Sequence, residues 1–235
     1  MAVLSKRMEA LYHMAGSGEV LADVGCDHGF LSIALCKDHR FSSAVAMDVR
    51  EGPLSRAREH IAAAGLSQRI DCRLSDGLFA LEEKEADVIL IAGMGGALMQ
   101  RILIEGGSKA KQAKTLVLQP QSQIREFRYF LQEQGYVFLD EDAVFEDGKY
   151  YFLMQTASRE ALGERDCITY HSEAEFAFGG CLMKKQHPVL LEYVEHEKAI
   201  CKETLFKLEQ SNSTPAVKSR KQEITDILKL LSEVG

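Results

Sequence analysis

The sequence of 235 residues contains no Cys-x-x-Cys pair, and its six cysteines are scattered along the chain. This pattern disfavours both a metal site and a disulfide framework, so we expect reduced thiols, a cytoplasmic location and no bound metal. Long apolar runs are also missing, since none approaches the roughly 20 residues of a membrane-spanning helix. We therefore expect no association with a membrane.

An apolar signal-peptide core is missing from residues 1–16, because charged side chains interrupt them. An excess of positive charge is missing as well, since the formal net charge is −7 at pH 7. A negative net charge weighs against a nucleic-acid partner, unless basic residues cluster locally. The length is sufficient for one α/β domain of ordinary size with an appendage.

Apolar runs and amphipathic segments alternate over the first 160 residues. The runs at 20–24, 44–49, 70–74, 86–92, 115–118, 136–139 and 150–155 predict strands. The segments 4–15, 30–37, 52–64, 97–104 and 124–134 predict helices, and 105–114 predicts a loop. Because most strands lack two-residue periodicity, we expect a mainly parallel sheet covered on both faces, with a hairpin at its end.

The composition changes near Ala161. Residues 173–186, 189–210 and 216–234 are charged and helix-forming, and Pro215 interrupts them. Apolar residues at three- and four-residue spacing predict two antiparallel helices that bury their stripes against each other. We therefore expect one domain over residues 1–160 and a helical coiled-coil domain over residues 161–235. A purely structural role for the helical pair remains an alternative.

Acids and glycines mark four predicted strand ends. They are Asp23-Val-Gly25, Asp48, Asp76-Gly77 and Gly93-Met-Gly-Gly96. In an open parallel sheet these ends lie along one edge, where ligands bind. Asp48 is placed to accept both hydroxyls of a ribose, and Asp76-Gly77 is placed at the edge of an adenine. Together the four positions predict a nucleoside ligand.

The glycine turn distinguishes between two nucleoside cofactors. A dinucleotide fingerprint would read Gly-x-Gly-x-x-Gly, but Asp27 stands where its second glycine would be. A carboxylate there would repel a pyrophosphate and would tolerate an ammonium or sulfonium cation. S-adenosylmethionine therefore fits better than NAD, and an NAD-dependent oxidoreductase is kept as an alternative.

Five motifs spread over the chain resemble those of the bacterial tRNA (adenine-22-N1)-methyltransferase family. They are Leu4-Ser-Lys-Arg7, Asp23-Val-Gly-Cys-Asp-His28, Asp76-Gly-Leu78, Ile91-Ala-Gly-Met-Gly-Gly-Ala97 and Leu118-Gln-Pro120. The resemblance implies a class I, Rossmann-like methyltransferase domain with a doubly wound sheet, followed by a coiled coil. It also implies S-adenosylmethionine as cofactor and N1 of adenine 22 in tRNA as the methylated atom. A methyltransferase with another substrate is a further alternative.

The same resemblance implies a set of cofactor-binding residues. They are Asp23, Gly25, Asp27, His28, Asp48, Asp76, Gly77, Gly93 and Met94. Family members often carry Ala-Tyr after Asp-His, whereas this chain has Gly29-Phe30, so no role can rest on a tyrosine hydroxyl here. The ring of Phe30 is still able to stack on a base.

Adenine N1 has a free lone pair at neutral pH, so no proton has to be removed before the methyl group is transferred. We expect Asp27 to stabilise the cation that forms on the methylated base, and we expect His28 to act as a donor that positions the base. A role of both residues in shaping the turn alone is the alternative. The base, exposed by flipping or local opening of the RNA, would meet further residues. They are Phe30, Gly95, Gly96, Gln119 and Pro120.

The sequence leaves open the preferred tRNA, the residues that contact RNA and the oligomeric state.

Overall fold

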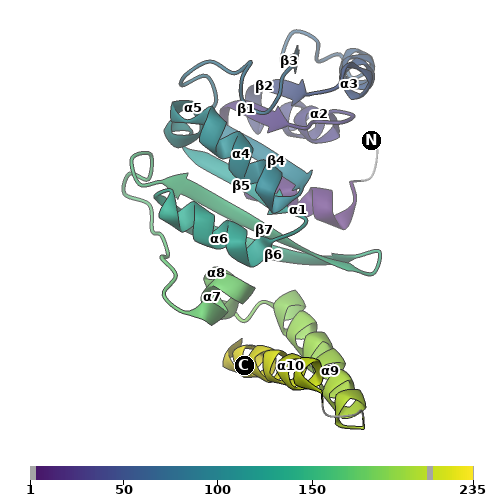
Figure 1. Ribbon diagram of the computed structural model, residues 1–235. Helices are drawn as coiled ribbons and strands as arrows, with labels where there is room; N and C mark the ends of the chain where they lie inside the picture. Colours follow the sequence, from purple (N-terminus) through teal and green to yellow (C-terminus); the bar gives the residue numbers. More distant parts are fainter. Residues whose placement is uncertain (1–3, 211–213, 235) are drawn as a thin grey trace. The chain divides into compact units, whose positions relative to one another are not determined.

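The computed structural model describes residues 4–210 and 214–234. Among these residues, seven strands form a single sheet in the order β3-β2-β1-β4-β5-β7-β6 (Figure 1). The strands are β1 (Gly18–Val24), β2 (Phe41–Asp48), β3 (Ile70–Leu74), β4 (Val88–Met94), β5 (Thr115–Pro120), β6 (Tyr136–Glu146) and β7 (Lys149–Ser158). Strands β1 to β5 pair in parallel, and β7 runs antiparallel to both β5 and β6. The predicted parallel sheet with a closing hairpin is confirmed.

Six helices of the described first unit cover the two faces of the sheet, and α1 precedes the first strand. They are α1 (Lys6–Ala15), α2 (Phe30–Lys37), α3 (Glu51–Ala63), α4 (Gly96–Gly106), α5 (Ser108–Gln112) and α6 (Ile124–Glu133). Helices α1, α2 and α3 pack side by side on one face, and α4 packs with α5 and α6 on the other (Figure 1). The expectation of a continuous loop over residues 105–114 is wrong, because the short helix α5 lies within it.

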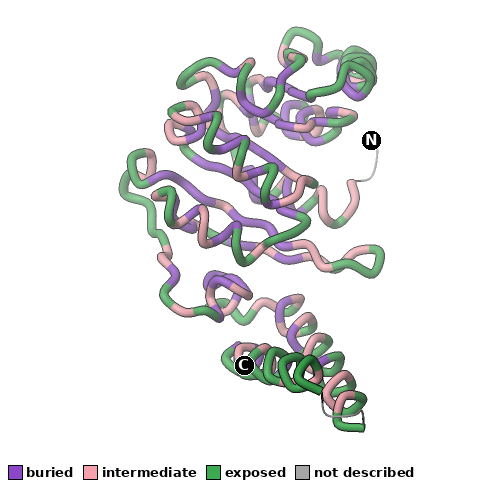
Figure 2. Tube along the Cα trace, viewed as in Figure 1, coloured by how far each residue is buried: buried purple, intermediate pink, exposed green. Residues whose placement is uncertain are grey.

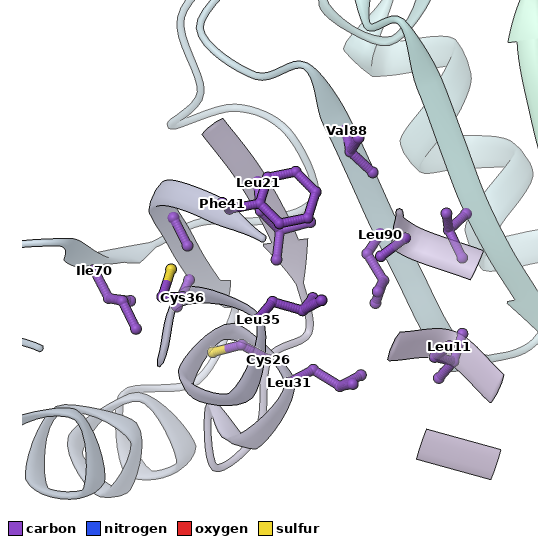
Figure 3. Close-up of a cluster of buried hydrophobic side chains, with 14 of the residues drawn as sticks. Leu11, Leu21, Cys26, Leu31, Leu35, Cys36, Phe41, Ile70, Val88 and Leu90 are labelled. Carbon is purple, nitrogen blue, oxygen red and sulfur yellow. The ribbon is translucent and has the colours of Figure 1, made fainter. Parts of the chain in front are cut away.

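The core between the sheet and helices α1 to α3 is made of aliphatic and aromatic side chains (Figure 3). Leu21, Leu35 and Phe41 have no exposed surface, and Leu11 and Leu90 have almost none. Figure 2 shows the buried central strands lying between helices that alternate buried and exposed residues. Because burying one such side chain contributes about 1.5–3 kcal/mol, this cluster fixes α1 and α2 against the strands.

The remaining residues form a second compact unit, and the two units divide between Thr169 and Tyr170. This division lies beyond the change of composition near Ala161, because Ile168 still pairs with Phe138 of β6. The helices of the second unit are α7 (Glu173–Phe178), α8 (Gly180–Lys184), α9 (Pro188–Glu209) and α10 (Pro215–Leu231), followed by the 3-10 turn η1 (Ser232–Val234).

Within the second unit, α9 and α10 pack against each other as the apolar spacing predicts. The helix-forming segment over residues 173–186 is helical in two pieces, α7 and α8, because the chain breaks at Gly179, where φ is 92°. Tyr170 packs closely on the first residue of α8. Its ring is almost fully buried, and a Cβ added to Gly180 would lie 2.6 Å from the ring atom Cε1.

No helix in residues 4–210 and 214–234 is long and apolar enough to cross a membrane.

One buried ion pair joins a helix to the sheet edge. The Nε atom of Arg128 in α6 donates to Oε1 of Glu141 in β6 over 2.8 Å, and neither side chain has exposed surface. A buried charge has lost its hydration, so each member of the pair depends on the other.

We expect Glu141→Gln to lower the free energy of unfolding by about 3–5 kcal/mol, because the buried guanidinium then loses the carboxylate that it contacts over 2.8 Å. Urea unfolding followed by circular dichroism measures this change. The matched control is the double variant Arg128→Met/Glu141→Leu, which should recover much of the loss because it removes both charges. A loss below about 1 kcal/mol for Glu141→Gln would contradict the dependence.

Candidate active site

The carboxyl ends of β1 and β4 lie side by side at the centre of the sheet, where the strand order reverses direction. In open α/β sheets such a switch point forms a crevice that binds ligands. Gly25 follows β1 and Gly93 lies near the end of β4, with φ values of 73° and 78°. Two cavities, of about 440 and 410 Å³, open at this point and both reach Gly25, Asp27 and Gly93. The first extends toward Arg7 and Phe30, and the second toward β2 and β3.

The turn after β1 is tied to the neighbouring strand. The backbone N–H groups of Gly25 and Cys26 both donate to the carbonyl oxygen of Met47, over 2.8 and 2.9 Å. These two amides are therefore not directed at a ligand. A Cβ added to Gly25 would overlap the Cε atom of Met94, which could swing aside, so it is the left-handed backbone at this position that favours glycine. Met94 thus lies over the turn, at the wall of the second cavity.

The second cavity contains the carboxylate predicted for the ribose. Asp48 is 7% exposed, and its Oδ1 accepts the N–H of Arg50 over 2.8 Å, which orients the side chain. The exposed side chains of Val49 and Leu98 line the same cavity. A buried, oriented carboxylate between apolar walls is chemically suited to a nucleoside.

Asp76 and Gly77 also line the second cavity. Both carboxylate oxygens of Asp76 accept from Arg101 of α4, over 2.8 and 3.0 Å. These hydrogen bonds hold the pKa of Asp76 below its usual value, so the carboxylate stays ionised. Gly77 has a φ of 61°, and a Cβ there would lie 3.0 Å from Cγ1 of Ile102, so the turn packs directly on α4.

Asp23 lies at the wall of the first cavity and is only 4% exposed. Burial raises the pKa of its carboxyl to about 6, with a smaller contribution from the charge of Asp48. The Ser32 hydroxyl donates to its Oδ2 over 2.7 Å and partly offsets this increase. Asp23 therefore ties β1 to α2 and places partial negative charge beneath the glycine turn.

Asp27 and His28 stand next to each other at the first cavity. Oδ2 of Asp27 lies 3.7 Å from Nε2 of His28, and Oδ1 lies 3.9 Å from a guanidinium nitrogen of Arg56. Both separations exceed hydrogen-bond length, and the Asp27 side chain is 64% exposed. The carboxylate is thus available to a cation that enters the cavity.

Arg7 of α1 supplies a positive charge to the first cavity. Its NH1 group donates to Oε1 of Gln119 over 3.1 Å, and its guanidinium lies 5.3 Å from the centre of the Tyr151 ring. The same Oε1 accepts the N–H of Gly93 over 3.2 Å. Gln119 is fully buried, so it braces Arg7 and Gly93 and would influence the cavity through them.

Pro120, Gly95 and Gly96 were predicted to contact the base, but they are not among the described residues that line either cavity. Gly96 packs on the following loop: its N–H donates to the carbonyl oxygen of Ser122 over 3.1 Å, and an added Cβ would lie 2.6 Å from that oxygen. Gly96 therefore sets how closely α4 approaches the loop after β5. Phe30 lines the first cavity, and its stacking on the base stays a prediction.

The structure adds residues that the motifs did not assign to the site. Arg101 fixes Asp76, Gln121 lines the first cavity and His60 stacks on Phe30. Arg101 lies 25 positions after Asp76, so no local pattern relates them. Among the described residues, no group of three or more His, Cys, Asp and Glu side chains could hold a metal ion.

Comparison with known proteins agrees with this geometry. A family model described as a methyltransferase domain matches residues 4–154. The chain is 32% identical over 231 residues to the tRNA (adenine(22)-N(1))-methyltransferase of Bacillus subtilis, covering 98% of this chain and 96% of that protein.

Two solved structures are similar over nearly their full length. The crystal structure of the B. subtilis m1A22 tRNA methyltransferase TrmK superposes with a TM-score of 0.83 and 32% identity, covering 100% of this chain and 99% of that one. A Streptococcus pneumoniae protein proposed to be a tRNA (m1A22) methyltransferase, in complex with S-adenosyl-L-methionine, gives a TM-score of 0.83 at 32% identity and covers 99% of each chain. The chain therefore belongs to the tRNA (adenine(22)-N1)-methyltransferase family, as its five motifs predicted.

Proposed function

We propose that this protein transfers a methyl group from S-adenosylmethionine to N1 of adenine 22 in tRNA. The observation that carries the proposal is the pair of cavities that meet at Gly25 and Gly93, one with an oriented buried carboxylate and one with an aromatic wall. A methyltransferase must hold its cofactor and the target base on either side of one point, and two joined cavities allow this. A tRNA substrate also implies a cytoplasmic enzyme.

The residues of the second cavity fit the adenosine moiety of the cofactor. Asp48 would accept the ribose hydroxyls, and the Asp76 carboxylate, held ionised by Arg101, would accept the adenine amino group. In the first cavity Arg7 would pair with the cofactor carboxylate, and Asp23 and Asp27 would face its cationic groups. When bound, the cofactor supplies an electrophilic methyl group on a sulfonium.

The first cavity would also receive the target adenine. Phe30 offers a ring on which the base can stack, and Asp27 offers a carboxylate close to the cation that forms on the methylated ring. His28, which lines the same cavity, would act as a donor that positions the base. Because N1 lies on the Watson–Crick edge, a paired adenine must first leave its helix, and the open cavity mouth at Phe30 allows entry.

The second unit would serve RNA recognition. Lys184, Lys185 and Lys202 are exposed on its helices, and Lys198 pairs with Glu195 over 2.8 Å. Acidic residues on the same helices balance these charges, so their arrangement and not an overall excess would create a face for phosphates.

We expect Asp48→Ala to weaken S-adenosylmethionine binding about 10- to 150-fold, because hydrogen bonds to a charged group contribute about 1.5–3 kcal/mol. Isothermal titration calorimetry measures the dissociation constant. Asp71→Ala is the matched control, since Asp71 is exposed, pairs with Arg73 and lies outside both cavities. Wild-type affinity for S-adenosylmethionine in a folded Asp48→Ala protein would contradict the assignment of Asp48 as the acceptor of the ribose hydroxyls.

We expect the product to be N1-methyladenosine, because N1 needs no deprotonation and the chain carries Gly93-Met-Gly-Gly96 in place of the Asn/Asp-Pro-Pro-aromatic motif of exocyclic-amine methyltransferases. Mass spectrometry of nucleosides from treated tRNA identifies the product. A transcript with guanine at position 22 should stay unmodified. Detection of N6-methyladenosine alone, with base-catalysed rearrangement excluded, would disprove the proposed chemistry.

Truncation after Thr169 should leave cofactor affinity near normal while methyl transfer to tRNA collapses. This position keeps the pairing of Ile168 with Phe138, so the first unit retains its contacts. A truncated protein that methylates tRNA at the full-length rate would assign the helices a purely structural role.

In the full chain, Lys202→Glu should raise the tRNA dissociation constant if the lysine contacts a phosphate. The variant should then also flatten the log–log salt dependence of tRNA binding by about one unit.

A further inference from the structure

Three aromatic rings meet beside the first cavity. The ring centres of His28 and Phe30 are 5.4 Å apart, those of Phe30 and His60 4.9 Å, and those of His28 and His60 5.5 Å. The Phe30 ring is nearly parallel to both imidazoles, with interplanar angles of 15° and 20°. Because the three distances are nearly equal, the rings form a compact cluster in which each ring neighbours the other two.

The three residues differ in their access to the cavity. Phe30 and His28 line it, and Phe30 is 36% exposed, whereas His60 supports the cluster from α3 and is not among the described lining residues. His60 therefore contacts the ring of Phe30 without reaching the space in which a base would lie. Any effect of His60 on a bound base has to pass through its neighbours.

The position of His60 is set by backbone contacts. Its Nδ1 lies 3.1 Å from the carbonyl oxygen of His28, and since a carbonyl only accepts, Nδ1 carries the proton and donates. Helix α3 also packs closely on the turn: a Cβ added to Gly29 would lie 3.3 Å from Cβ of Ala57 and 3.6 Å from Cδ1 of Ile61. His60 is thus held beside a turn whose own backbone is left-handed at Asp27 and Gly29.

We propose that His60 is a positioning residue that holds the Phe30 ring as the stacking surface for the target adenine. The proposal rests on the proposed function, in which the base enters the first cavity. A phenylalanine that is partly exposed at a cavity mouth has several rotamers, and each unproductive one must be given up when the base stacks. Contact with an imidazole fixed to the neighbouring backbone selects one of them in advance.

The ring of His60 and its hydrogen bond can be separated by substitution. His60→Phe keeps a ring against Phe30 and removes the donor to the His28 carbonyl. His60→Asn keeps a donor close to the position of Nδ1 and removes the ring. His60→Ala removes both. If His60 acts by supporting Phe30, the phenylalanine variant should behave as wild type, and the other two should share one defect.

The expected defect is a fall of about 2- to 10-fold in kcat/KM for tRNA, the size of one lost aromatic pair. It should appear mainly in kcat, because the rest of the tRNA still binds. The S-adenosylmethionine dissociation constant should be unchanged, since His60 is not among the described residues that line either cavity. In a Phe30→Ala background, His60→Ala should cause no further loss, because a residue that acts through Phe30 has nothing left to position.

A spectroscopic measurement gives an independent result. The chain has no tryptophan, so Phe30→Trp places a single indole at the stacking position. Binding of tRNA should quench its emission when a base stacks on the indole, and addition of His60→Ala should reduce that quenching. A transcript that lacks adenine at position 22 serves as the control for RNA bound elsewhere.

The outcomes separate this proposal from the function on which it rests. If the wild-type enzyme leaves tRNA unmethylated, the proposed function fails. If wild type is active and His60→Ala retains full activity, the positioning role is wrong. It is also wrong if His60→Ala lowers kcat/KM by the same factor in the Phe30→Ala background as in the wild-type background. Activity retained by His60→Asn and lost by His60→Phe would also overturn it, because the hydrogen bond would then be the required contact. Should His60→Ala fold poorly, these two variants still decide the question.

Discussion

The candidate site depends on how the turn after β1 is fastened. Two successive amides, of Gly25 and Cys26, donate to the single carbonyl of Met47, so the turn is bound to β2 before any ligand arrives. This attachment holds the left-handed residue Asp27 at the point where both cavities meet. It also brings the turn beneath Met94, whose Cε atom lies where a side chain at position 25 would begin. The backbone thereby determines where the cofactor and the base can approach each other.

The same edge of the sheet concentrates carboxylates, and the fold controls each one differently. Asp23 is buried with a raised pKa and a serine partner, Asp48 is oriented by the amide of Arg50, and Asp76 is paired with Arg101. Such separate environments limit the repulsion among like charges that would otherwise oppose folding of this edge. They also divide the tasks: Asp23 braces β1 through Ser32, whereas Asp48 and Asp76 line the second cavity.

The packing of helix α3 on the glycine turn affects both the stability of the domain and the geometry of the site. Gly29 allows α3 to approach the turn, and that approach places His60 against both the His28 carbonyl and the Phe30 ring. Packing that stabilises the domain therefore also sets the orientation of a ring at the cavity mouth. In the second unit, the ring of Tyr170 likewise packs closely on a glycine, Gly180.

The sequence by itself determined the alternation of strands and helices, the parallel sheet, the acids at its strand ends and the family, because local periodicity and short motifs carry these features. The packing of distant segments decided the rest. Arg101 and Asp76 are 25 positions apart, and His60 and His28 are 32 apart, so only the folded sheet brings them together. Gln119 and Gly96 belong to recognisable motifs, yet the direction of their contacts toward Arg7 and Ser122 depends on neighbours that no local pattern specifies. Spacing along a chain reports which face a residue occupies, whereas the identity of its partner is a property of the tertiary structure.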